Sequence, residues 1–252
     1  MRGGIARAFD LDCIAIFLDV DGTLVEFAPS PESAVAPEGL AACLARVESA
    51  LGGALALVSG RTVNDLDRLL WPLRTRASGV HGAEIRLDPT APIVAAGQTQ
   101  ALPARMWRKL NATLTNFPGV VAENKLFSFA VHYRAAPNLA APLGEALRRF
   151  VGEEAPPRLE LIEGRLVYEI KARGFDKGAA IRRFMARAPF AGRTPIFVGD
   201  DATDEAGFAA VADLRGFAYS VGRSRLAIDG EFPDPATVRR WLDDLVTEQV
   251  RT

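Results

Sequence analysis

The sequence CIAIFLDVDGTL, residues 13–24, carries six mostly apolar residues that run directly into two aspartates. A continuous apolar run of this length is typical of a strand that is covered on both faces of a parallel sheet. Packing gives no reason to end such a strand on the carboxylates of Asp19 and Asp21. We therefore expect a buried strand whose carboxyl end carries chemistry.

Three more short apolar runs end at polar or glycine-rich breaks: ALALV (54–58) before SGR, PIFV (195–198) before GDD, and FAYSV (217–221) before Gly222. Helical patterns lie between them, as in residues 37–53, where leucine and valine recur at steps of three and four. Strand and helix in alternation predict an α/β fold with a doubly wound parallel sheet. Ligands of such sheets bind at the carboxyl ends of the strands, where these polar breaks fall.

The middle of the chain has a different pattern. Residues 104–117 and 140–154 are predicted helices, residues 119–134 hold two strand-like stretches, and residues 158–170 resemble a hairpin that turns at Glu163 and Gly164. Adjacent strands indicate an antiparallel sheet with helices on one face. We predict a small α/β domain at 102–173, inserted into a larger domain formed by 1–101 and 174–252.

Charge and composition exclude several classes of partner. The 252 residues include 30 basic and 31 acidic side chains, for a net charge of −1, so bulk electrostatics would not recruit nucleic acid or an anionic membrane. Cys13 and Cys43 show no metal-ligand or disulfide spacing, and we expect both to be buried packing residues in a reducing compartment. No apolar run reaches the length of a signal peptide or a membrane span. The prediction is a cytoplasmic protein.

Acidic residues gather at two predicted strand ends. The segment VGDDATDE (198–205) adds Asp200, Asp201 and Asp204 to Asp19 and Asp21. Carboxylates that converge in one crevice repel each other unless a cation lies between them. Because the cluster offers only oxygen ligands, it favours a hard ion, and Mg²⁺ in particular.

Phosphate-binding groups are expected in the same crevice. Ser59 offers a hydroxyl and, with Gly60 and Arg61, backbone N–H groups at a helix N-terminus. Thr23 offers a second hydroxyl, and Lys177 offers a positive charge. This set of groups predicts phosphoryl transfer to an aspartate. Asp19 would attack phosphorus, while Asp21 protonates the leaving group and later deprotonates the attacking water.

The segments DVDGTL (19–24), VSGR (58–61), DKG (176–178) and VGDDATDE (198–205) resemble the motifs of the haloacid-dehalogenase (HAD) superfamily. With GVHGAEI (79–85), ENK (123–125), AVHYR (130–134) and EGRLVYEI (163–170), the chain resembles trehalose-6-phosphate phosphatases more closely. The resemblance implies a Rossmannoid core with an inserted cap and trehalose 6-phosphate as substrate. It also implies that Asp200 binds Mg²⁺ beside Asp19 and the backbone carbonyl of Asp21, and that Asp204 contacts these ligands or reaches the ion through a water molecule.

The same resemblance assigns the sugar-reading residues of the cap to Glu123, Lys125, Arg134, Arg165 and Glu169. Such side chains offer paired hydrogen bonds to the neighbouring hydroxyls of a disaccharide. Functional pairing with a trehalose-phosphate synthase is a further implication. The resemblance leaves the roles of His81 and His132 open.

Three other functions remain compatible with these residues. The chain could act on another sugar phosphate, such as sucrose phosphate or mannosyl-phosphoglycerate, because only the cap would differ. It could be an inactive scaffolding module, although this would tolerate loss of Asp19, which is present. It could also pass the phosphoryl group to an acceptor other than water. Phosphate release from a panel of sugar phosphates distinguishes these alternatives.

Overall fold

The computed structural model of the chain describes residues 9–28, 33–97, 101–154, 159–164, 166–222 and 229–247. The chain divides into two compact units. One, the core unit, consists of Met1–Val94 and Asp176–Thr252, and the other, the inserted unit, is Ala95–Phe175. The boundaries expected from the sequence, 102 and 173, both lie inside the inserted unit.

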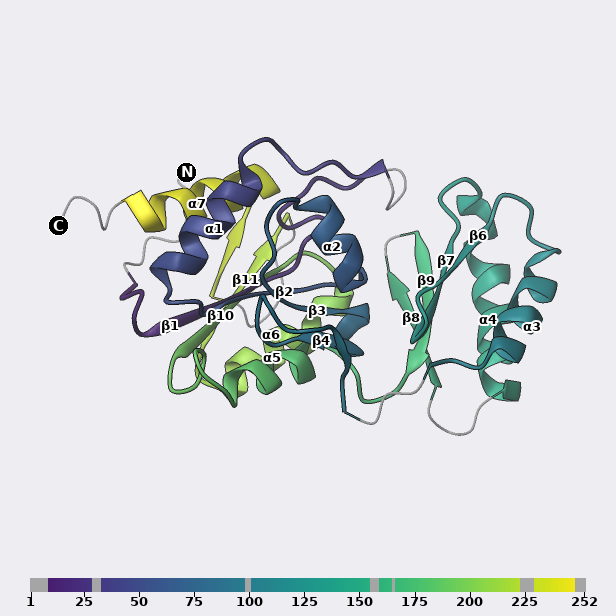
Figure 1. The fold of residues 1–252 in the computed structure, drawn as a ribbon. Coiled ribbons are helices and arrows are strands. Elements are labelled where there is room, and N and C mark those ends of the chain that lie inside the picture. Colours follow the sequence, from purple (N-terminus) through teal and green to yellow (C-terminus); the bar gives the residue numbers. More distant parts are fainter. Residues whose placement is uncertain are drawn as a thin grey trace. The chain divides into compact units, whose positions relative to one another are not determined.

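The core unit is built around an eight-stranded sheet of order β12-β11-β10-β1-β2-β3-β4-β5 (Figure 1). The pairs from β12 to β3 are parallel, and β4 runs antiparallel to β3. The strands are β1 (Ile14–Leu18), β2 (Leu55–Val58), β3 (Arg76–Gly79), β4 (Glu84–Arg86), β5 (Val94–Ala95), β10 (Thr194–Gly199), β11 (Phe217–Val221) and β12 (Gly230–Phe232). The predicted doubly wound parallel sheet is confirmed.

Strand β1 lies in the middle of this sheet, between β10 and β2. All five of its residues are buried, as the continuous apolar run predicts. The four strands expected from apolar runs are β1, β2, β10 and β11. No comparable apolar run marks β3, β4 and β12, which have only three or four residues each.

Helices cover both faces of the core sheet (Figure 1). Helices α1 (Leu40–Ala50) and α7 (Pro235–Thr247) pack together on one face, and α5 (Lys177–Met185) and α6 (Glu205–Asp213) pack together on the other. Helix α2 (Val63–Leu69) contacts β3 and β4. Short 3-10 turns, η2 (Val80–Gly82) and η4 (Ala202–Asp204), follow β3 and β10.

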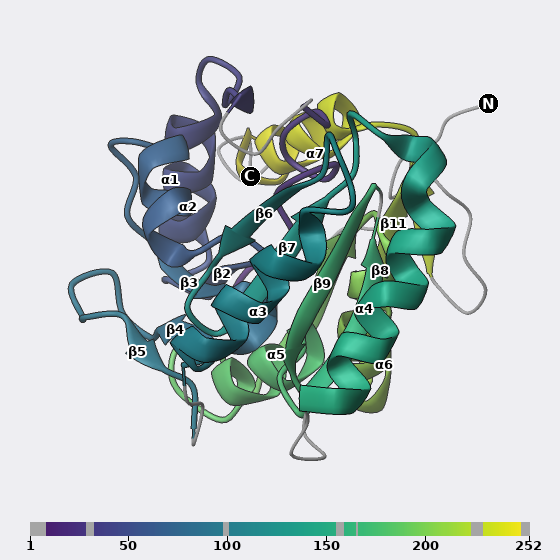
Figure 2. The same ribbon diagram turned by 90° about the vertical axis from the view of Figure 1, so that its right-hand side faces the viewer.

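The inserted unit is an antiparallel sheet of order β6-β7-β9-β8 with two helices on one face (Figure 2). Its strands are β6 (Val121–Asn124), β7 (Ser128–His132), β8 (Leu159–Gly164) and β9 (Val167–Ala172). Its helices are α3 (Ala104–Leu114) and α4 (Ala140–Glu154), with the 3-10 turn η3 (Pro137–Leu139) before α4. The predicted antiparallel sheet is confirmed.

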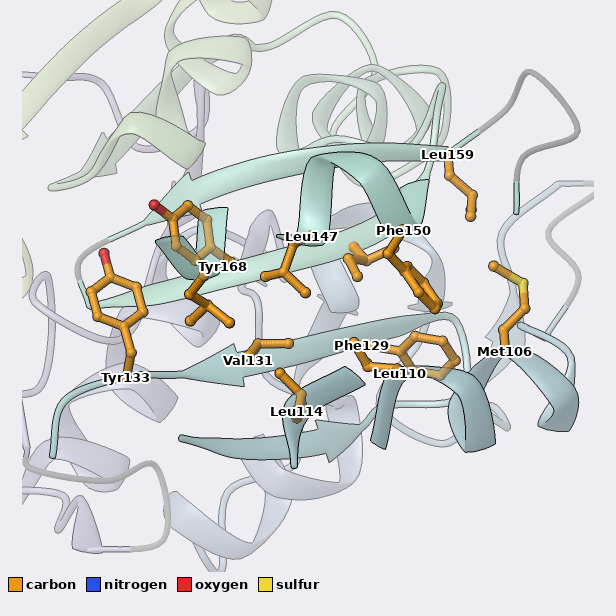
Figure 3. Packing of buried hydrophobic residues seen from close by; sticks show 12 residues of the cluster. Met106, Leu110, Leu114, Phe129, Val131, Tyr133, Leu147, Phe150, Leu159 and Tyr168 are labelled. Atoms are coloured by element: carbon orange, nitrogen blue, oxygen red, sulfur yellow. The ribbon is translucent and has the colours of Figure 1, made fainter. Parts of the chain in front are cut away.

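The face that meets the helices carries the apolar core of the inserted unit (Figure 3). Phe129 and Val131 of β7 and Tyr168 of β9 pack there against Leu110 and Leu147 from α3 and α4. Each large apolar side chain removed from water contributes about 1.5–3 kcal/mol. Since side chains alternate along a strand, the residues between these positions face the opposite side of the sheet. That opposite side is the polar face of the inserted unit.

Two expectations need correction. Glu163 and Gly164 belong to β8 rather than to a turn, because Gly164 still pairs with Val167 of β9. Cys43 is buried as expected, but Cys13 is exposed, because it lies in the turn before β1 and donates from Sγ to Asp10 Oδ2 over 3.3 Å. Among the helices of the described residues, none has the length and apolarity that a bilayer crossing needs.

Candidate active site

The carboxyl ends of β10, β1 and β2 bring the predicted catalytic residues together in the core unit. Asp19 follows β1, and its backbone N–H donates to the Val198 carbonyl of β10 over 2.9 Å. Asp200 follows β10, and Ser59 follows β2. Because the three strands are parallel neighbours, their polar ends meet at one edge of the sheet.

The turn after β1 is shaped by Gly22. The chain reverses there through hydrogen bonds from the N–H groups of Leu24 and Val25 to the Val20 carbonyl. Gly22 has φ +82°, a left-handed conformation that favours glycine. A Cβ atom at this position would lie 2.2 Å from Asp200 Oδ2. The glycine therefore permits both the turn and the close approach of the Asp200 carboxylate.

Lys177 is held between two carboxylates. It is the first residue of α5, where Asp176 caps the helix by accepting from the Ala179 N–H. Its Nζ atom donates to Asp19 Oδ1 and to Asp204 Oδ1, each over 2.6 Å. The lysine side chain is only 2% exposed, so the contacts are shielded from water. Lys177 thus fixes the orientation of Asp19.

Asp204 organises the loop after β10. Its Oδ2 atom accepts from the backbone N–H groups of Asp200 and Asp201, over 3.0 and 2.9 Å. Asp201 is the N-cap of η4, and the two residues form a capping box. Both Asp204 oxygens are therefore engaged by protein donors. This arrangement places Asp200 rather than Asp204 with its carboxylate toward the Gly22 turn.

The buried charges of this cluster shift one another's pKa values. Burial raises the pKa of Asp19 well above its ordinary value, although Lys177 opposes the shift. Burial and the neighbouring Asp204 raise the pKa of Asp200 to about 7. Burial also disfavours the charge on Lys177, but Asp19 and Asp204 outweigh it and raise the pKa of the lysine. The cluster thus holds more negative charge than one lysine compensates.

An added cation fits this charge balance. One carboxylate oxygen from each of Asp19, Asp200 and Asp204 lies within 4.8 Å of the others. Asp19 and Asp204 are buried, so water does not screen their repulsion. An all-oxygen donor set of this kind suits a hard divalent ion.

The loop after β2 provides hydroxyl and backbone groups. Ser59 is buried, and its Oγ atom accepts from the Arg61 N–H over 3.2 Å. Arg61 directs its guanidinium to Asp21, donating from Nε to Oδ2 over 2.6 Å and from Nη2 to Oδ1 over 2.7 Å. Thr23 is fully buried, and its Oγ1 atom makes no hydrogen bond within the described part of the chain. These groups surround the ends of β1 and β2.

His81 lies against the same loop in an unusual backbone conformation. Val80 and His81 have φ +48° and +52°, a region that β-branched residues rarely adopt. The His81 N–H donates to the Ser59 carbonyl over 3.0 Å, and the imidazole leaves no room for a Cβ atom on Gly60, which would lie 2.6 Å from Nε2. Backbone strain of this kind concentrates at functional sites. His81 thus packs against the Ser59 loop, and a Cβ atom at position 60 would require its imidazole to move.

Two contacts that support the loop after β2 were not predicted from the sequence: a hydrogen bond to Glu84 and an ion pair of Arg86. Glu84 accepts from the Val63 N–H at the start of α2 and so ties the Ser59 loop to β4. Arg86 is fully buried and pairs with both oxygens of Asp67, each over 2.6 Å. The Glu84 signal was available in the HGAE segment, whereas the Arg86 pair joins α2 to β4 and leaves no local pattern.

The polar face of the inserted unit carries two of the residues predicted to read the sugar. Glu123 of β6 and Glu169 of β9 lie in register on either side of Ala130 in β7. Glu123 Oε2 lies 3.4 Å from His132 Nε2, and Ser128 Oγ donates to Glu169 Oε1 over 2.6 Å. The two carboxylates are therefore each held by a neighbour on β7.

The other predicted sugar-reading residues lie at the ends of these strands. Lys125 follows β6, where its N–H donates to the Ser128 carbonyl over 2.9 Å. Arg134 lies in the turn after β7, two residues after His132. Arg165 lies outside the described residues.

Comparison with known proteins gives one family. A model of the trehalose-phosphatase family matches residues 17–231. The trehalose-6-phosphate phosphatase of Escherichia coli (strain K12) is 39% identical over 233 residues, which cover 92% of this chain and 86% of that protein. A probable trehalose-phosphate phosphatase of Sinorhizobium fredii (strain NBRC 101917 / NGR234) is 39% identical over 217 residues, 86% of this chain and 81% of that protein.

A similar solved structure extends the likeness to the fold. It is the crystal structure of a trehalose-6-phosphate phosphatase related protein, with a TM-score of 0.76 and 27% identity, covering 94% of this chain and 99% of that one. The matched range contains Asp19, Lys177 and Asp200, which the core unit brings together. The family expected from the sequence motifs is confirmed. The chain belongs to the trehalose-phosphatase family.

Proposed function

We propose that the protein hydrolyses trehalose 6-phosphate to trehalose and phosphate through an aspartyl-phosphate on Asp19. The observation that carries the proposal is the Asp19 carboxylate, which is buried at the end of β1 and held by Lys177 beside Asp200. Membership of the trehalose-phosphatase family supports the substrate. The matched relative from Escherichia coli is itself named a trehalose-6-phosphate phosphatase.

In the first half-reaction, an Asp19 carboxylate oxygen forms a bond to phosphorus. Lys177 holds that carboxylate in a fixed direction, which lowers the entropic cost of the attack. The bond between phosphorus and the sugar oxygen breaks, and its electron pair moves to that oxygen. Asp21 supplies the proton that completes the sugar hydroxyl.

In the second half-reaction, water attacks the phosphorus of the aspartyl-phosphate. Asp21, now a carboxylate, accepts a proton from this water. The bond between the Asp19 oxygen and phosphorus breaks, which releases phosphate and restores the Asp19 carboxylate. The same two aspartates therefore serve both steps with opposite proton transfers.

We propose Mg²⁺ as the cofactor, held by the carboxylates of Asp19 and Asp200 and the backbone carbonyl of Asp21. Asp204 would act on the ion indirectly, because both of its oxygens already accept hydrogen bonds from the protein. When bound, the ion neutralises the repulsion between the anionic nucleophile and the phosphate. Burial and the Asp204 carboxylate raise the pKa of Asp200 to about 7, and a cation at this site would oppose both effects.

The phosphate would bind between the ends of β1 and β2. Ser59 Oγ already accepts one hydrogen bond, which leaves its O–H free to donate to the anion. The buried Thr23 hydroxyl, which has no partner in the described residues, gains one from the phosphate. The backbone N–H of Gly60, just before α2, would supply a further donor, whereas the Arg61 N–H already donates to Ser59 Oγ.

Sugar selection is assigned to the inserted unit, as a cap over residues 102–173. Glu123 and Glu169 would accept hydrogen bonds from sugar hydroxyls, while Lys125 and Arg134 donate to them. The in-register placement of the two glutamates on the polar face supports this role. Arg165 is proposed as a further donor on sequence resemblance alone.

The cellular setting follows from this substrate. Trehalose 6-phosphate must be supplied by a trehalose-phosphate synthase, so we propose functional pairing with such an enzyme. A cytoplasmic location is proposed for the same reason, and the balanced charge of the chain agrees with a small-molecule substrate rather than nucleic acid.

The test compares phosphate release from trehalose 6-phosphate, sucrose 6-phosphate and glucose 6-phosphate with Mg²⁺ present. We expect trehalose 6-phosphate to be strongly preferred and Asp19→Asn to be inactive on all three, because an amide is a poor nucleophile. Asp12→Asn, at an exposed carboxylate in the turn before β1, is the matched control. Equal rates on the three sugars would refute the substrate, and an active Asp19→Asn variant would refute the mechanism.

A further inference from the structure

The Arg61 side chain forms an ion pair with Asp21, the proton carrier of the proposed reaction. Both oxygens of Asp21 accept from the guanidinium, from Nε over 2.6 Å and from Nη2 over 2.7 Å. The Arg61 side chain is 10% exposed and that of Asp21 is 31% exposed. A bidentate pair of this kind fixes the rotation of the carboxylate as well as its position.

The arginine is a rigid support for this contact. Its N–H donates to Ser59 Oγ over 3.2 Å, and its carbonyl accepts from the Val80 N–H over 2.9 Å. The next residue, Thr62, is the N-cap of α2, where its side chain accepts from the Asp65 N–H. Three contacts from three elements thus anchor the backbone from which the guanidinium extends.

Asp21 lacks comparable anchoring of its own. It lies in the turn after β1 and is joined to Val25 through a single bridge. A partly exposed aspartate in such a turn can rotate about its side-chain bonds unless a partner holds it. Arg61 supplies that partner. A carboxylate that accepts two hydrogen bonds keeps two lone-pair sites for other groups.

We propose that Arg61 is a positioning residue, whose side chain orients Asp21 for proton exchange with the sugar oxygen and with water. The guanidinium affects the reaction through Asp21 rather than by binding phosphate. The inference rests on the proposed function, because it requires Asp21 to be the proton donor.

The consequence depends on the leaving group. When the bond between phosphorus and a sugar oxygen breaks, the electron pair goes to an oxygen that is too basic to leave without a proton. A p-nitrophenolate ion is a weak base and leaves without one. Loss of the Asp21 orientation should therefore slow the first step for sugar phosphates and spare p-nitrophenyl phosphate.

The experiment measures kcat/KM for trehalose 6-phosphate and p-nitrophenyl phosphate, since this ratio reports events up to formation of the aspartyl-phosphate. For Arg61→Gln, we expect roughly a 10–100-fold loss on the sugar phosphate, the range that misplacement of a catalytic group produces. On p-nitrophenyl phosphate we expect a loss below about threefold. Arg61→Lys should resemble Arg61→Gln, because lysine keeps the charge but lacks the planar fork.

Two controls separate orientation from other effects. Arg68→Gln removes an arginine that is 79% exposed on α2 and should leave kcat/KM unchanged for both substrates. In an Asp21→Asn background, Arg61→Gln should cause no further loss on trehalose 6-phosphate, because the group through which it acts is already gone. Retained turnover of p-nitrophenyl phosphate also shows that each variant is folded.

Three results would overturn the inference: an equal loss on both substrates, an undiminished loss in the Asp21→Asn background, or full activity of Arg61→Gln on the sugar phosphate. The first two indicate a phosphate-binding or structural guanidinium. Failure of the proposed function has a separate signature, because the unmodified enzyme would then release no phosphate from trehalose 6-phosphate, or Asp19→Asn would stay active.

Discussion

Replacing Lys177 by methionine tests how the buried charge cluster is stabilised. Methionine keeps much of the volume of the lysine stem but removes the charge and the two 2.6 Å hydrogen bonds to Asp19 and Asp204. Asp204 retains its backbone donors, whereas Asp19 loses its nearest positive charge. We expect the Lys177→Met protein to be strongly destabilised in the absence of metal.

The size of the effect follows from burial. The Lys177 side chain is 2% exposed and those of its partners are 7% and 0% exposed, so solvent does not replace the lost interaction. Removal of one partner from a buried ion pair costs about 3–5 kcal/mol. In a chain of this size, that corresponds to a fall in Tm of roughly 6–20 °C. Catalysis should fall by about 10²–10³-fold, as for other preorganised cationic or dipolar groups.

The measurement is thermal unfolding in EDTA, with hydrogen exchange used to locate the loss in α5 and β1. Added Mg²⁺ should restore part of the stability, because it neutralises Asp19 in place of the lysine. Lys109→Met is the matched control, since Lys109 pairs with Glu153 over 3.3 Å at 42% exposure and should cost less than about 1 kcal/mol. If both variants lose the same stability in EDTA, the cluster does not depend on Lys177 and the reasoning is wrong.

Three further predictions concern the same edge of the sheet. Gly22→Ala should lower the free energy of unfolding by at least about 1–2 kcal/mol, because position 22 has φ +82°. The new Cβ atom would also collide with Asp200, so we expect calorimetry to detect no Mg²⁺ binding, and normal binding would contradict this. In EDTA, stability should fall as pH rises from about 4 to about 7, because folded Asp200, with its pKa raised to about 7, binds a proton that the unfolded chain releases. The loss of unfolding free energy over this pH range is about 4 kcal/mol. Urea unfolding measures it as the difference in pH dependence between the unmodified protein and Asp200→Asn, and equal pH dependences would refute the prediction. Glu84→Ala should lower the unfolding free energy by about 1–3 kcal/mol by leaving the Val63 N–H without its acceptor, whereas Glu84→Gln should lose less.

The sequence signal for the fold was strong where apolar runs are continuous and weak elsewhere. Strand β1 is buried on both faces and could be recognised from composition alone. Strand β3 has the sequence RASG, and three of its four residues are buried because it pairs with β2 and β4. Its position depends on partners distant in the chain, which a local pattern does not contain. The same limit applies to the three-residue β12.

The candidate site divides along a similar line. Residue types and spacing were sufficient to nominate Asp19, Lys177 and Asp200, because their motifs follow recognisable strands or begin a helix. The left-handed conformation of His81 could not be inferred from the sequence, since the backbone carbonyls that accept hydrogen bonds from His81 and its neighbour Val80 belong to Ser59 and Arg61. Nor could the motif show which cation approaches which aspartate.

The different cation partners give the two aspartates that follow β1 different properties. A spacing of two would direct both side chains to one side if the strand continued, but β1 ends at Leu18 and the chain turns at Gly22. Asp19 is consequently buried against Lys177, a group 158 positions away, while Asp21 stays partly exposed against Arg61, 40 positions away. A nucleophile benefits from a desolvated, fixed carboxylate, and a proton carrier needs access to the leaving group and to water. The separate cations therefore supply the asymmetry that the proposed reaction requires of two chemically identical side chains.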